Sequence, residues 1–138
     1  MSRVRIQVAD LTFEAEFEEE AAPQTCAAFR SILPFRSHLI QARWSGEAGW
    51  VPLGDMSFGV DPENATTYPS RGDILLHPAD ASETEILFPY GSCAFASKVG
   101  ALSGNHFLTL TKGHEHLREM GRRVLWEGAQ PIVIELAD

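Results

Sequence analysis

The sequence predicts a single, mainly β domain over residues 1–138, with a closed sheet or sandwich and one main helix. Two early segments alternate apolar and polar residues with period two, which is typical of strands. One short segment has helical period, and a series of short strand-like runs separated by turn residues follows it. This spacing fits an all-β architecture and does not fit βαβ units. A chain of 138 residues is long enough to bury one such core.

The N-terminal segments predict a β-hairpin. Val4, Ile6 and Val8 alternate with polar residues, and residues 11–17 alternate in the same way after the pair Ala9-Asp10. Side chains of a strand point to opposite faces in turn, so each segment has one apolar face. We therefore expect two paired strands that bury one face.

The main helix is expected at about residues 22–33. Pro23 suits a first helical turn, because the N–H that proline lacks has no partner there. Cys26 and Phe29 lie on one helical face together with Ile32 and Leu33, and a proline follows.

The remainder of the chain predicts strands. One exception is the segment of residues 54–72, which has no clear periodicity and is expected to be a long surface loop of the kind that often carries function. The strand-like runs are "SHLIQARW", "EAGWVPL", "GDILLHP", "TEILFPY", "CAFASKV", "NHFLTLT", "RRVLWEG" and "PIVIEL".

Composition excludes several classes of partner. The formal net charge is −8 and the pI is about 5, so phosphate-rich surfaces are repelled and neither nucleic acid nor a membrane is expected as a partner. No apolar run approaches the length of a membrane span, and the alternating N-terminus does not resemble an export signal. The two cysteines have no partner spacing, which favours free thiols in a reducing, cytoplasmic setting. No cofactor is expected, and self-association stays open.

Two stretches resemble the cyclophilins. "LTFEAEFEEEAAPQTCAAFRSIL" resembles the cyclophilin opening of two strands, an "APxT" helix start and a phenylalanine-arginine pair. "GNHFLTLTKGHEHLREMGRRVLWEG" resembles the cyclophilin stretch with a Gly-Ser-Gln-Phe-Phe strand and a later His-Leu loop. Together they cover about a third of the chain.

The chain is more similar still to a bacterial family of stand-alone cyclophilin-like proteins of unknown function, through "ARWSGEAGWVPLGD" and the later "GDILLHP" and "ILFPYG". This resemblance implies a closed β-barrel of about eight strands with a helix over one end. It implies no reaction.

The departures from the cyclophilins concern their catalytic strand. Cyclophilin isomerases carry "FHR", whose arginine polarises the prolyl amide, followed by "QGGD". The comparable segment here has neither, and Arg43 is its only arginine. We therefore expect prolyl isomerase activity to be absent or very weak, and whether the protein is an enzyme at all stays open.

Two groups of residues suggest a metal site or a catalytic pair, but a structural interpretation of each is favoured. His114 and His116 stand at alternate positions and could chelate a metal if a third ligand arrived, but the motif spacings of known metal sites are missing, and a solvated loop is favoured. Cys93 with His106 could form a nucleophilic pair, but a packed structural cysteine is favoured. No metal site is predicted.

Arg43 and the two tryptophans near it are the stronger candidates for contacts with a ligand. A turn at Ser45-Gly46 would place Trp44 and Trp50 on neighbouring strands, where they stack on a ligand or pack as ordinary strand residues. Arg43 either recognises a carboxylate or carbonyl group or pairs with Glu47. The sequence leaves these alternatives open.

The leading functional hypothesis is a groove on the barrel that binds a small, carbonyl-bearing metabolite. The cyclophilin resemblance places Phe107 at the groove floor, with His116 over it from the loop. The competing hypotheses are a peptide-binding or weakly isomerising module and a subunit that acts only by assembly. The predicted ligand-binding residues are Arg43, Trp44, Trp50, Tyr90, Asn105, His106, Phe107 and His116.

Overall fold

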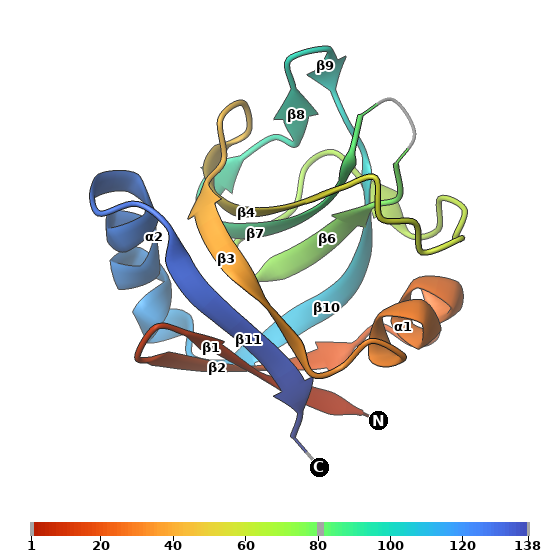
Figure 1. The fold of residues 1–138 in the computed structure, drawn as a ribbon, viewed down its shortest axis with the longest axis horizontal. Coiled ribbons are helices and arrows are strands. Elements are labelled where there is room, and N and C mark those ends of the chain that lie inside the picture. The colour runs from red at the N-terminus through yellow and green to blue at the C-terminus, as the bar shows by residue number, and fades with distance from the viewer. Residues whose placement is uncertain (1, 80–81, 138) are drawn as a thin grey trace.

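The protein is a closed antiparallel β-barrel with a helix on either side (Figure 1). The structure is a computed structural model that describes residues 2–79 and 82–137. Its strands and helices are β1 (Arg3–Val8), β2 (Leu11–Phe17), α1 (Pro23–Arg30), β3 (Phe35–Gln41), β4 (Gly46–Gly54), β5 (Ala65–Thr66), β6 (Asp73–His77), β7 (Thr84–Cys93), β8 (Ala96–Ser97), β9 (Gly100–Ala101), β10 (Gly104–Lys112), η1 (His114–His116), α2 (Leu117–Trp126) and β11 (Gln130–Leu136).

The barrel closes through eight strands. Their order is β2-β1-β11-β3-β4-β7-β6-β10, and β10 pairs in turn with β2, while the two-residue β5 adds to the start of β10. Every pairing is antiparallel. The predicted closed barrel of about eight strands with a main helix is confirmed.

The N-terminal hairpin forms as its alternation predicts. Ile6 pairs with Phe13 across β1 and β2, and both side chains are fully buried. The turn residue Ala9 takes a positive φ, and Asp10 is exposed. The apolar faces of these strands contribute to the main core inside the barrel.

Helix α1 lies where the sequence predicts it, but it is shorter than residues 22–33. Pro23 occupies the first turn, and Cys26 and Phe29 are buried against the barrel. The backbone N–H and the hydroxyl of Thr25 both donate to the carboxylate of Glu63, at 2.7 and 2.8 Å. The loop predicted at residues 54–72 is therefore tied to the start of α1.

Helix α2 corrects the prediction of a strand at "RRVLWEG". The buried residues of this helix are Leu117, Met120, Gly121 and Val124, which follow a spacing of three, one and three. This helical period begins before the strand-like run and continues through it. The predicted His-Leu loop is the one-turn helix η1 and the first residue of α2.

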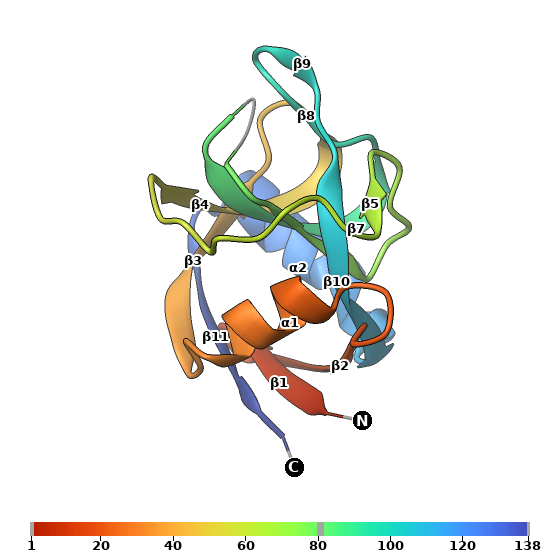
Figure 2. The same ribbon diagram turned by 90° about the vertical axis from the view of Figure 1, so that its right-hand side faces the viewer.

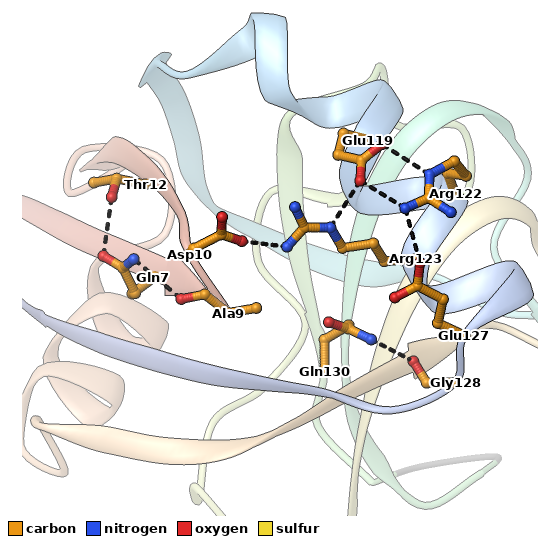
Figure 3. Close-up of polar contacts among 10 residues, drawn as sticks. All are labelled: Gln7, Ala9, Asp10, Thr12, Glu119, Arg122, Arg123, Glu127, Gly128 and Gln130. Atoms are coloured by element: carbon orange, nitrogen blue, oxygen red, sulfur yellow. Dashed lines mark hydrogen bonds and ion pairs between the residues drawn. The ribbon is translucent and has the colours of Figure 1, made fainter.

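An ion-pair network fixes α2 to the N-terminal hairpin (Figure 3). Arg123 binds Asp10 in the turn between β1 and β2, and its Nε donates to Glu119 at 2.8 Å. Arg122 donates to Glu119 and to Glu127, each at 2.8 Å.

The two helices, α1 and α2, lie on opposite sides of the barrel, as Figures 1 and 2 both show. Neither of them, in the described residues, has the length and apolar character needed to cross a membrane.

A second, smaller core lies on the outer face of β4, β6 and β7. Ile86 and Phe88 point into the main core, while Leu87 between them points outward into this second cluster. On the neighbouring strand β6, Leu75 likewise points away from Ile74 and Leu76. The outer cluster consists of Ala42, Ala48, Leu75, Leu87, Phe95 and Leu102, with Trp50 and Cys93 packed against it. Its presence means that these strands are apolar on both faces.

Candidate functional site

The outer face of the barrel carries a pocket of about 390 Å³, which we call the aromatic pocket. Its floor comes from β4 and β7, and its walls come from the turn between β3 and β4 and from the β8–β9 hairpin. In Figure 1 this hairpin stands beside the β3–β4 turn at the top of the barrel. The side chains that give the pocket its character are Arg43, Trp44, Trp50, Glu85, Leu87 and Lys98.

Ser45 joins the two walls of the aromatic pocket. Its hydroxyl donates to the carbonyl oxygen of Ala96 at 3.2 Å and accepts the N–H of the same residue at 3.1 Å. Its own carbonyl accepts the N–H of Ala94 at 3.0 Å. The β3–β4 turn therefore positions the β8–β9 hairpin through specific bonds.

Trp50 occupies the pocket because of the alternation along β4. Its neighbour Val51 enters the main core, so the indole of Trp50 lies on the outer face, between Ile40 of β3 and Leu87 of β7. The guanidinium carbon of Arg43 lies 5.6 Å from the centre of the indole ring, in a cation–π arrangement.

Arg43 is not paired with Glu47, the alternative that the sequence left open. The carboxylate of Glu47 accepts the backbone N–H of Ser92 at 2.8 Å instead. No ion pair to Arg43 occurs within residues 2–79 and 82–137. Arg43 is exposed, so its charge is available at the rim of the pocket.

Glu85 is a site residue that the sequence analysis missed. Its side chain is 4% exposed on β7 and lines the aromatic pocket. Burial raises the pKa of this carboxyl from 4.5 to about 7, the nearby indole N–H of Trp50 acts in the opposite direction, and the charge of Glu83 adds to the rise. The signal in the sequence was one acidic residue within the otherwise apolar run of β7.

The indole N–H of Trp50 is buried without a hydrogen bond of normal geometry among the described residues. Buried N–H groups are nearly always bonded, and each exception calls for an explanation. The carboxyl of Glu85 lies near this N–H, which lowers its pKa, so the pocket combines a buried indole N–H beside a buried carboxyl with an exposed guanidinium.

Of the eight predicted ligand-binding residues, the structure gathers Arg43, Trp44 and Trp50 in the aromatic pocket. Trp44 is 59% exposed at the rim, whereas Trp50 is half-buried in the floor. Tyr90 lines a different, wider groove of about 600 Å³, formed with α2. Within that groove the Tyr90 hydroxyl donates to Gln41 at 2.7 Å.

Asn105 and Phe107 contribute to the main structure of the barrel. Asn105 is 1% exposed, and its side-chain amide donates to the Thr25 hydroxyl at 3.0 Å and to the carbonyl of Asp61 at 3.1 Å. Phe107 is fully buried, and its ring lies 5.1 Å from that of Phe29. Neither of these side chains lines the aromatic pocket.

The two predicted histidines also lie away from the aromatic pocket. The Nε2 atom of His106 lies 2.7 Å from the hydroxyl of Thr109. The ring of His116 packs edge-on against Phe13, with ring centres 6.0 Å apart, so its aromatic partner is not Phe107. Within the described part of the chain, no group of three or more His, Cys, Asp or Glu side chains is arranged to hold a metal ion.

The fold places the protein in a structural class: it is a cyclophilin-like β-barrel protein. The chain belongs to the family described as "Protein of unknown function (DUF3830)", whose model matches residues 4–136. A comparison with curated proteins finds no significant match.

Three solved structures share this fold. McbB in complex with tryptophan has a TM-score of 0.69 and 17% identity over 96% of this chain, which spans only 44% of McbB. A hypothetical protein from Archaeoglobus fulgidus has a TM-score of 0.60 and 22% identity, covering 99% of this chain and 95% of that one. A cyclophilin-type peptidyl-prolyl cis-trans isomerase of Cryptosporidium parvum, solved in the presence of the dipeptide Ala-Pro, has a TM-score of 0.61 and 13% identity over 99% of each chain. At these identities the likeness is one of fold.

Proposed function

We propose that this protein binds a small, carbonyl-bearing metabolite in the aromatic pocket. The observation that carries the proposal is the guanidinium of Arg43, which is exposed at the rim over the indole of Trp50 and has no ion pair within residues 2–79 and 82–137. A carbonyl or carboxylate oxygen of a ligand would accept hydrogen bonds from this guanidinium.

The apolar lining and the size of the aromatic pocket suit the same class of ligand. Leu87 and the indole of Trp50 offer apolar surface in the floor. A volume of about 390 Å³ falls within the range of small-molecule sites, which is about 300–1,000 Å³.

The relatives in fold guide the choice of ligands to test. McbB was solved in complex with tryptophan, and the parasite isomerase in the presence of Ala-Pro. We therefore include amino acids and short peptides in the screen, beside carboxylic acids, amides and keto acids. The free state of Cys26 and Cys93 supports the inference that the protein works in a reducing compartment.

A thermal-shift screen tests the proposal. A ligand that binds only the native state stabilises it by RT ln(1 + [L]/Kd), about 2.7 kcal/mol at a hundredfold excess over Kd. Arg43→Gln removes the charge, and Trp50→Phe reduces the aromatic surface of the floor. We expect Arg43→Gln to weaken binding of a hit by about tenfold or more, because a hydrogen bond to a charged group contributes about 1.5–3 kcal/mol. Trp50→Phe should also weaken binding, because the smaller ring offers less apolar contact.

Two matched substitutions serve as controls for the screen. Trp126→Phe changes an exposed tryptophan of α2, and Arg36→Gln changes an exposed arginine of β3, and neither residue lines the aromatic pocket. Both variants are expected to bind as the unmodified protein does. A saturable hit whose affinity is the same in Trp50→Phe, Arg43→Gln and the two controls would show that the ligand binds elsewhere. Light scattering on the same samples records the oligomeric state.

A further inference from the structure

The aromatic pocket has two charged groups of opposite sign that the indole of Trp50 keeps apart. Arg43 lies over the face of the ring, 5.6 Å from its centre. Glu85 lies by the N–H edge of the same ring, close enough for that N–H to lower its pKa. No ion pair joins Arg43 to Glu85 in the described part of the chain. Each charge is therefore left for another partner.

Glu85 and Glu83 form the acidic end of the pocket. Glu85 is 4% exposed, and the side-chain donor that acts on its carboxyl is the indole N–H of Trp50. Glu83, which also lines the pocket, adds a second negative charge near it. A buried carboxylate is costly unless a cation or several donors compensate it. A ligand that places a positive group there would supply the compensation.

We propose that the ligand of the aromatic pocket is an amino-carboxylate, of which the α-amino acids are the simplest members. Its carboxylate binds Arg43, its ammonium group binds Glu85, and its side chain lies against the floor made by Trp50 and Leu87. This inference rests on the proposed function of the pocket and names the substrate class. The positive charge of Arg43 and the negative charge of Glu85 match the two charges of the ligand. The ammonium group also offsets the free-energy cost of burying the Glu85 carboxylate.

The pH dependence of binding has a sign that separates this ligand class from others. Burial raises the pKa of Glu85 to about 7, and an adjacent ammonium would lower it. Binding of an amino-carboxylate therefore releases a proton and tightens as the pH rises from about 5 to above 7. A neutral carbonyl ligand that accepts a hydrogen bond from the protonated carboxyl would bind more tightly at low pH instead.

The other titratable groups around Glu85 are few. On β6 its partner in register is His77, whose Nδ1 lies 2.8 Å from the carbonyl of Ser103. On β4 the residue in register with Glu85 is Pro52, which does not titrate. Lys98 and Arg43 are the two basic residues that line the pocket, and both come from the turns.

Matched sets of probes test the proposal by isothermal titration calorimetry. Each set contains an L-amino acid, its analogue without the amino group and its analogue without the carboxylate. The sets are L-tryptophan, indole-3-propionate and tryptamine; L-phenylalanine, 3-phenylpropionate and phenethylamine; and L-leucine, 4-methylpentanoate and isopentylamine. At pH 7.5 we expect an amino acid to bind at least tenfold more tightly than either of its analogues.

Two variants test which side chain of the pocket binds which charged group of the ligand. Glu85→Gln is expected to abolish the preference for the amino acid over the analogue without the amino group, and Arg43→Gln the preference over the analogue without the carboxylate. Circular dichroism confirms that each variant is folded, and titration in buffers of different ionisation enthalpy measures proton release without any substitution.

The outcomes separate this inference from the proposed function. If the analogues without the amino group bind as tightly as the amino acids, with proton uptake instead of release, the amino-carboxylate assignment is wrong and the carbonyl-binding function stands. If no amino acid of the three sets binds at 10 mM, the assignment is also wrong, while the metabolite screen and Trp50→Phe still test the function independently.

Discussion

Replacing Glu85 by glutamine is expected to stabilise the protein above pH 7 and to change its stability little near pH 4.5. The native state holds this carboxyl in a buried setting that raises its pKa from 4.5 to about 7, whereas the unfolded chain ionises it near 4.5. Between these pH values the unfolded state binds fewer protons than the native state, so the stability of the protein falls as the pH rises. Glutamine has nearly the same shape and no charge, so the variant lacks this loss.

The magnitude follows from the two pKa values. Each pH unit of separation corresponds to about 1.4 kcal/mol, so a rise from 4.5 to about 7 corresponds to at most about 3 kcal/mol. The pocket is open to water on one side, which lowers the cost of the charged form. We therefore expect the variant to gain about 1–3 kcal/mol relative to the wild-type protein at pH 8.

Urea unfolding at half-unit steps from pH 4.5 to 8.5 measures this difference. The control is Glu119→Gln on α2, where hydrogen bonds from Arg122 and Arg123 lower the pKa of the carboxyl to about 2. The stability from Glu119 is complete above pH 4.5 and is lost only as the pH falls toward 2, so this variant should differ from the wild type by a constant amount over the measured range. A Glu85→Gln difference that is equally independent of pH would refute the reasoning.

Four further outcomes are expected. Gly121→Ala should cost about 1–2 kcal/mol, because a Cβ there would lie 2.2 Å from ring atoms of Tyr90 and the gain of about 1 kcal/mol in helix propensity offsets only part of the clash. Asn105→Ala should cost about 1–3 kcal/mol, since it removes the partner of three buried or part-buried hydrogen bonds. At pH 8, Cys26 and Cys93 should react with Ellman's reagent about a hundredfold more slowly in the native protein than in urea, because burial raises the pKa of these thiols to about 12 and about 11. A protease-coupled assay on an Xaa-Pro peptide should show no prolyl isomerase activity above background, since the catalytic "FHR" motif of the cyclophilins is missing.

Exposed positions are the controls for the two stability predictions: one on α2, which carries Gly121, and one on α1, whose Thr25 is a partner of Asn105. Arg118→Ala on α2 and Gln24→Ala on α1 should each change the free energy of unfolding by less than about 0.5 kcal/mol. Equal stability of Gly121→Ala and Arg118→Ala would contradict the close packing of α2 on the barrel. Fast labelling of either thiol in the native protein would contradict its burial, and isomerase turnover lost in Arg43→Gln would show that Arg43 acts as the cyclophilin arginine does.

The sequence predicted the barrel because alternation and turn residues are local signals. It predicted the N-terminal hairpin and the position of α1 for the same reason. It failed for α2, where β-branched and aromatic residues in "RRVLWEG" suggested a strand. The helical period of the residues before that run outweighs this local preference, because burial of one face against the barrel stabilises the helix.

The candidate site was predicted only in part, for a reason that β10 illustrates. Phe107 and Leu108 are adjacent, yet both are fully buried and both belong to the main core. The register shift between His106 and Leu108 interrupts the alternation of β10, so the sequence pattern placed Phe107 in a groove when it belongs to the core. Glu85 was missed for the converse reason, since a charged residue in an apolar run suggests an exposed position and only the fold shows that it is buried.

The location of the aromatic pocket follows from how the barrel is filled. Six phenylalanines are fully buried, and five of them, Phe13, Phe17, Phe29, Phe88 and Phe107, belong to the main core. A barrel of eight strands has room for side chains or for one small ligand, and here side chains take the space. A binding site must then lie outside, where β4 and β7 present apolar side chains on a second face and short turns supply the walls. The two charges that we propose select the ligand therefore lie at the edge of the scaffold: Arg43 follows β3 and Glu85 lies near the start of β7. Substitutions at these two positions should change ligand preference while the barrel stays folded.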